Sequence, residues 1–148
     1  MGCDVSDYLH ATAVVIGEKG VLLLGASGAG KSALAEKLIA EAQLAGQFAR
    51  LIGDDRVAVR RVGEHLIATG HPLLQGQIER RGVGIISSNQ IDRAVLAGAV
   101  EILPSPERLP AEPAPTFHHA GIDLPLLTLR DDRDLGAKAH LVCDWLKR

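Results

Sequence analysis

The segment from Gly25 to Ser32 reads GASGAGKS and fits the pattern G-x-x-x-x-G-K-[ST] at every fixed position. Glycines let successive backbone N–H groups curl around phosphate oxygens, and a helix that begins after the loop points its positive end at them. In this pattern the lysine, Lys31, neutralises the β and γ phosphates, and the hydroxyl of Ser32 ligates Mg²⁺. We therefore predict a phosphate loop (P-loop) that binds a nucleoside triphosphate. Its residues are Gly25, Ala26, Ser27, Gly28, Ala29, Gly30, Lys31 and Ser32.

The elements around the P-loop match the context that the pattern requires. Two apolar runs, HATAVVI over 10–16 and VLLL over 21–24, flank a turn and predict a hairpin that leads into the loop. The segment 32–45 places leucines and an isoleucine close to one helical face, and Gly46 is a suitable terminator. Strand, glycine loop and helix are thus expected in that order.

An acidic pair, Asp54 and Asp55, follows a short apolar run after this predicted helix. A helix of about a dozen residues returns the chain to a strand beside the one before the P-loop. In a doubly wound sheet, ligands gather at the carboxyl ends of such strands, which would bring the pair next to the P-loop. Adjacent residues in an extended segment point to opposite sides, so only one aspartate would face the γ-phosphate. The pair could hold a metal ion or accept a proton.

A second charged segment, IERRGVGII, carries Glu79, Arg80 and Arg81 just before an apolar run. A glutamate here could ligate a metal, and an arginine could stabilise charge on a transferring phosphoryl group. A solvated loop held by ion pairs is the alternative interpretation.

The rest of the chain predicts a small α/β fold. RVAVRRV and LIAT form a second hairpin, RAVLAGAVEIL and LPLLTL are strands, and 131–148 is a closing helix with an aspartate cap. Five of the seven prolines lie in 104–115, which predicts an extended loop. We expect one domain over 1–148: a P-loop nucleotide-binding domain with a mixed β-sheet including hairpins, flanked by helices.

Composition excludes several classes of protein. The chain has 148 residues with 16 basic and 18 acidic side chains, and no basic block suggests a nucleic-acid partner. No apolar run approaches the roughly 18 residues of a membrane span, so we expect a soluble, cytoplasmic protein without a membrane partner. Cys3 and Cys143 have neither metal-ligand nor redox spacing, which favours free thiols in a reducing compartment.

Four features in this order resemble a known family. They are His10 at the head of the first strand, GVLLLGASGAGKSAL, the DD pair and IERRGVGII. Together they look like the catalytic domain of bacterial HPr kinase/phosphorylase, in the short form found in alphaproteobacteria that lacks an amino-terminal domain. The resemblance implies an ATP- and Mg²⁺-dependent serine kinase of the phosphocarrier protein HPr, which in many members also removes the phosphate with inorganic phosphate. It also implies a homo-oligomer, a hexamer.

The resemblance implies roles for particular residues. Asp55 matches the family's catalytic aspartate, while Ser32 and Glu79 match its Mg²⁺-binding pair, with Asp54 as a further candidate ligand. His10 matches the family's strand-heading histidine and could orient Asp55 or shift its pKa.

The cationic residues implied by the resemblance are Lys31 in the P-loop, Arg81 in the signature Glu-x-Arg-Gly, and Arg108 in PERLP as the nearest match to a further arginine. One departure concerns the family's carboxy-terminal Pro-x-Arg-Pro-Gly-Arg loop, which is associated with dephosphorylation. Here only PLLTLR is present, with Arg130 near the place of the last arginine.

Two alternatives stay open at the level of sequence. A P-loop kinase of a small metabolite would be expected to use several arginines in a lid, for which Arg80, Arg81 and Arg108 are the candidates. A nucleotide-sensing module without transfer activity would use the P-loop alone.

Overall fold

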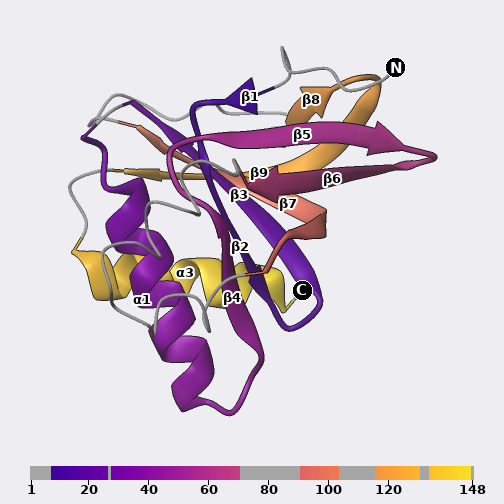
Figure 1. Cartoon of the computed structure of the whole chain (residues 1–148). Coiled ribbons are helices and arrows are strands. Elements are labelled where there is room, and N and C mark those ends of the chain that lie inside the picture. Colours follow the sequence, from indigo (N-terminus) through magenta and orange to yellow (C-terminus); the bar gives the residue numbers. More distant parts are fainter. Residues whose placement is uncertain (1–7, 27, 71–90, 104–115, 131–133, 148) are drawn as a thin grey trace, which may run out of the picture.

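The computed structural model describes residues 8–26, 28–70, 91–103, 116–130 and 134–147. These residues form a curled sheet with two helices, α1 and α3, on one face (Figure 1). The helices are α1 (Lys31–Leu44) and α3 (Leu135–Leu146). The strands are β1 (Tyr8–Leu9), β2 (Thr12–Ile16), β3 (Lys19–Gly25), β4 (Ala49–Gly53), β5 (Val57–Val62), β6 (His65–Gly70), β7 (Arg93–Leu103), β8 (Thr116–His119) and β9 (Ile122–Arg130). The prediction of an α/β fold with flanking helices is confirmed.

The sheet is mixed. Its strand order is β1-β5-β6-β7-β3-β2-β4, with β9 also paired to β7 and β8 paired to β9. The pairs β3–β7 and β7–β9 are parallel, whereas the hairpins β2–β3 and β5–β6 are antiparallel, as predicted. The long strand β7 pairs with β6 over its first residues and with β3 over the rest, so it joins the two halves of the curled sheet.

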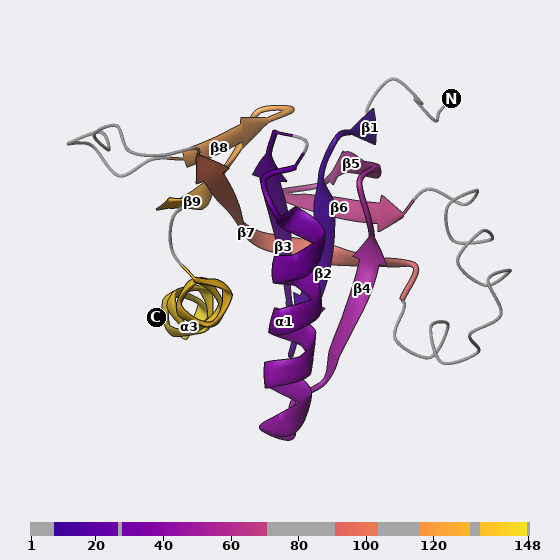
Figure 2. The same cartoon turned by 90° about the vertical axis from the view of Figure 1, so that its left-hand side faces the viewer.

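Two apolar clusters cover opposite faces of β2 and β3. Val14 and Ile16 face the cluster beneath α1 and α3, and Ala13 and Val15 face the cluster enclosed by β5 and β6. Figure 2 shows α1 lying along β2, β3 and β4, with α3 beside it and seen end-on. A strand covered on both faces needs a continuous apolar run rather than an alternating one, which explains the sequence of β2.

Two details of the predicted fold are wrong. The strand β4 does not lie beside β3, because β2 separates them and pairs antiparallel with both. The consequence for the site is small: β3 and β4 still run parallel, so their ends at Gly25 and Gly53 point to the same edge of the sheet. The closing helix begins at Leu135, later than predicted, because the side chain of Asp134 accepts a hydrogen bond from the N–H of Ala137 and caps it there.

Several predictions lie outside the residues that the structure describes. They are the segment IERRGVGII with its apolar run, the proline-rich loop 104–115, and the candidate site residues Ser27, Glu79, Arg80, Arg81 and Arg108. Neither of the described helices is long and apolar enough to span a membrane.

Candidate active site

The P-loop joins β3 to α1 through glycines whose backbone conformations other residues rarely adopt. Gly25, Gly28 and Gly30 have φ angles of 155°, 83° and 96°. Space at Gly25 is also tight, because a Cβ there would lie 3.1 Å from the carbonyl oxygen of Ile102. Gly30 is the N-cap of α1 and has no side chain with which to cap it. The first N–H groups of α1 are therefore left for an anion.

Lys31 is held at the opening of this loop. Its side chain is buried, and Nζ donates to the carbonyl oxygens of Gly25, at 2.9 Å, and Ala26, at 3.4 Å. An ammonium group has three N–H donors. Two carbonyl contacts orient Nζ and leave a third donor for a phosphate oxygen.

Asp54 connects the P-loop helix to the sheet. Its Oδ1 accepts a hydrogen bond from the hydroxyl of Ser32 at 2.6 Å and a second from the hydroxyl of Thr12 at 2.9 Å. The side chain of Thr12 is fully buried, whereas Ser32 is exposed at the start of α1. Two hydroxyl donors thus fix one carboxylate oxygen beside the predicted phosphate site.

The side chain of Asp55 points in a different direction from that of Asp54. The sequence attributed this difference to an extended segment, but the structure shows another cause. The pair is not in an extended segment: it forms a bend after β4, and Asp55 has a φ of 67°, in the left-handed region. Its carboxylate oxygen Oδ1 lies 3.4 Å from Nε2 of His10, and the two side chains are 60% and 57% exposed. The structure thus brings His10 close to Asp55, the condition under which the sequence suggested that His10 could orient it.

A polar cleft of about 370 Å³ brings these groups together. It is lined by Gly28, Gly30, Lys31, Ser32, Ala33, Asp54 and Asp55. A site of this size and composition, lined by a lysine, the start of α1 and two carboxylates, suits a phosphate chain next to an acceptor group.

The sequence of the chain matches that of a known protein family. Residues 4–94 match the family described as HPr Serine kinase C-terminal domain. The chain belongs to this family. A curated HPr kinase/phosphorylase from Prosthecochloris aestuarii is 33% identical over 132 residues, which cover 81% of this chain and 37% of that protein. Another, from Limosilactobacillus reuteri, is 40% identical over 98 residues, covering 66% and 27%.

The HPr kinase fold is also found among solved structures. The HPr(Ser) kinase/phosphatase from Coxiella burnetii matches with a TM-score of 0.71 at 20% identity, and the match covers 93% of this chain and 94% of that one. The chain spans about a third or less of the length of most of the curated relatives that it matches. The family resemblance and the fold predicted from the sequence are both confirmed.

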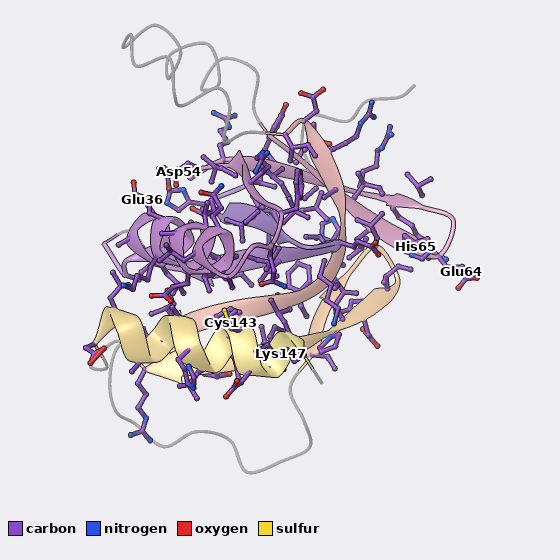
Figure 3. All side chains as sticks on the ribbon, turned by 90° about the horizontal axis from the view of Figure 1, so that it is seen from below. Glu36, Asp54, Glu64, His65, Cys143 and Lys147 are labelled. Atoms are coloured by element: carbon purple, nitrogen blue, oxygen red, sulfur yellow. The ribbon has the colours of Figure 1, made fainter. Side chains whose placement is uncertain are left out.

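Among the described residues, His65, His118 and His140 lie away from the candidate site. Glu64 and His65 lie at the tip of the β5–β6 hairpin, at the far side of the molecule from Asp54 (Figure 3). His118 pairs with Asp123 across the β8–β9 hairpin. His140 pairs with Asp144, one helical turn away on α3.

Thr12 is the site residue that sequence reasoning missed. It is the one polar side chain in the run ATAVVI, and a buried hydroxyl at the start of a strand covered on both faces requires a hydrogen-bond partner. This isolated polar residue indicated that Thr12 makes a buried hydrogen bond. Its partners could not be predicted, because they lie more than 40 residues further along the chain.

Proposed function

We propose that this domain is an ATP-dependent serine kinase of an HPr-like phosphocarrier protein. One observation carries the proposal: the exposed carboxylate of Asp55, with His10 beside it, lies on the same cleft as the buried Lys31. A nucleotide-sensing site needs only the phosphate-binding residues. The exposed carboxylate of Asp55 in the lining of the same cleft suits an incoming hydroxyl. The names of the curated relatives, HPr kinase/phosphorylase, support the choice of HPr as acceptor.

The phosphate-binding wall would hold ATP by backbone and charge. N–H groups of the loop and of the first turn of α1 would donate to the phosphate oxygens, and Nζ of Lys31 would add a charged donor. Phosphoryl transfer needs little covalent assistance, so positioning and charge stabilisation would supply most of the rate. Arg81 and Arg108 remain predicted contributors to this charge stabilisation, on the family resemblance alone.

Mg²⁺ fits the oxygen atoms that the structure gathers at one end of the cleft. The hydroxyl oxygen of Ser32 and Oδ1 of Asp54 are 2.6 Å apart, and hydroxyl and carboxylate oxygens are suitable Mg²⁺ ligands. Ser32 would bind the ion with Glu79 as the second predicted ligand, and Asp54 would bind it directly or accept from Ser32. The bound ion would neutralise charge on the β and γ phosphates.

Asp55 would act as the general base. The acceptor serine would give its proton to the carboxylate of Asp55 as its oxygen bonds to the γ-phosphorus. The bond from that phosphorus to the β–γ bridging oxygen would break, and ADP would leave. His10, 3.4 Å away, would orient the carboxylate toward the acceptor.

The same groups could run a phosphorolysis, which the relatives' names as kinase/phosphorylase support. Inorganic phosphate would attack the phosphorus of seryl-phosphorylated HPr, the serine would leave, and Asp55 would return the proton to its oxygen. The products would be HPr and pyrophosphate. Arg130, at the end of β9, lies on the same edge of the sheet as Gly25, since both strands run parallel to β7. The cytoplasmic hexamer implied by the resemblance stays a prediction.

An incubation with labelled ATP, Mg²⁺ and purified HPr tests the proposal. Label on a serine of HPr is the expected result. When a cell extract is added to the incubation, label on a small metabolite with none on HPr would favour a metabolite kinase. If ATP is bound but its phosphate is transferred to neither acceptor, only the nucleotide-sensing module remains. Seryl-phosphorylated HPr offered with inorganic phosphate tests the reverse reaction, and pyrophosphate release is the expected result.

A further inference from the structure

Thr12 makes two hydrogen bonds that join the two aspartates of the site. Its hydroxyl donates to Oδ1 of Asp54 at 2.9 Å and accepts from the backbone N–H of Asp55 at 3.3 Å. The residue is fully buried in β2, between Ala11 and Ala13, which face the opposite apolar cluster. A buried hydroxyl that uses its donor and its acceptor on adjacent residues is a connection between them rather than packing alone.

The bond to the N–H of Asp55 acts on an unusual backbone conformation. A φ of 67° is disfavoured for a residue with a Cβ, although aspartate tolerates it better than most. The N–H of Asp55 lies in the peptide plane that joins it to Asp54, so an acceptor fixed in β2 holds that plane. From this plane, a φ of 67° directs the Asp55 carboxylate toward His10.

The bond to Asp54 acts on the other half of the site. Oδ1 of Asp54 also accepts from Ser32 at 2.6 Å, so Thr12 holds the oxygen through which α1 contacts the acidic bend. Gly53, the residue before the pair, packs closely against β6, because a Cβ there would lie 3.0 Å from Cα of Gly70.

We propose that Thr12 is a positioning residue for phosphoryl transfer, and that its hydroxyl sets the directions of both carboxylates at once. The inference rests on the proposed kinase function and deepens it. Asp54 is kept beside Ser32 and the metal ligands, and Asp55 is kept toward the acceptor. The different roles of the two adjacent aspartates therefore depend on Thr12, which lies in β2, before the P-loop in the sequence.

Two substitutions separate the hydroxyl of Thr12 from its shape. Thr12→Val keeps the branched volume and removes both hydrogen bonds, and Thr12→Ser keeps the hydroxyl and removes the methyl group. Thr12→Val is expected to lower kcat for transfer to HPr by about 10- to 100-fold, the scale of a small misplacement of reacting groups. Its Kd for MgATP should stay within about threefold of wild type, because Lys31 and the loop N–H groups are untouched. Thr12→Ser should keep kcat within about threefold.

A matched control and a readout independent of activity complete the test. Val14→Thr places a hydroxyl on the same face of β2, two residues further into the core, and should lower the melting temperature without lowering kcat. Amide hydrogen exchange at Asp55 should be about tenfold faster in Thr12→Val than in wild type or Thr12→Ser.

Three results would overturn the inference: wild-type kcat in Thr12→Val, equal losses of kcat in Thr12→Val and Thr12→Ser, or unchanged exchange at Asp55. If the wild-type chain itself transfers no phosphate to HPr, the proposed function fails. The exchange rate of the Asp55 amide then still decides whether Thr12 holds the bend.

Discussion

Asp55→Asn removes the proposed base while leaving the shape of the bend. Asparagine has nearly the same volume and also tolerates the left-handed conformation seen at φ 67°. The pair with His10 is more than half exposed, so its loss should change the free energy of unfolding by no more than about 1 kcal/mol. Loss of a general base should lower the transfer rate by about 10²- to 10⁴-fold, equivalent to about 2.7–5.5 kcal/mol in the activation barrier.

The assay is single-turnover transfer from saturating MgATP to HPr, with nucleotide Kd measured separately. Asp144→Asn is a matched control, because it removes a similar exposed pair, with His140 at 3.5 Å, on α3 and away from the cleft. It should transfer at the wild-type rate. If Asp55→Asn also transferred at the wild-type rate while Asp54→Asn abolished transfer, the roles assigned to the two aspartates would be reversed.

Three further predictions concern binding, stability and thiol reactivity. Lys31→Ala should weaken MgATP binding by about 10- to 150-fold, the worth of a charged hydrogen bond, as measured by calorimetry; unchanged affinity would exclude the contact. Gly53→Ala should lower the free energy of unfolding in urea by about 1–3 kcal/mol, because the new Cβ meets backbone at Gly70; equal stability would contradict that packing. Burial raises the pKa of the Cys143 thiol. In a Cys3→Ser background, its alkylation at neutral pH should therefore be slower than that of an exposed cysteine and should rise only at more alkaline pH. A pH dependence like that of an exposed cysteine would refute this.

The P-loop and the elements around it could be predicted because their determinants are local. The glycines, Lys31 and Ser32 lie within eight residues, and the strand before them and the helix after them each have their own periodicity. The two hairpins were predictable for the same reason, since their turns contain Gly17 and Gly63 between complementary apolar runs.

The arrangement of strands and the geometry of the acidic bend could not be predicted in this way. The continuous apolar run of β2 indicates that both of its faces are buried, but it does not specify that β2 lies between β3 and β4. The left-handed conformation of Asp55 accompanies contacts with Thr12 and His10, which are formed only when distant segments pack. The interpretation of the pair as an extended segment also overlooked that glycine and aspartate are residue types typical of turns.

Mapping of the phosphorylated residue on HPr tests the central claim most directly. Purified chain, MgATP and HPr would be incubated together, and the modified position on HPr identified by mass spectrometry, with HPr alone as the control. The account predicts one phosphoserine that appears only when both the chain and Mg²⁺ are present. HPr that stays unmodified, while the chain is shown to bind MgATP in the same mixture, would contradict it.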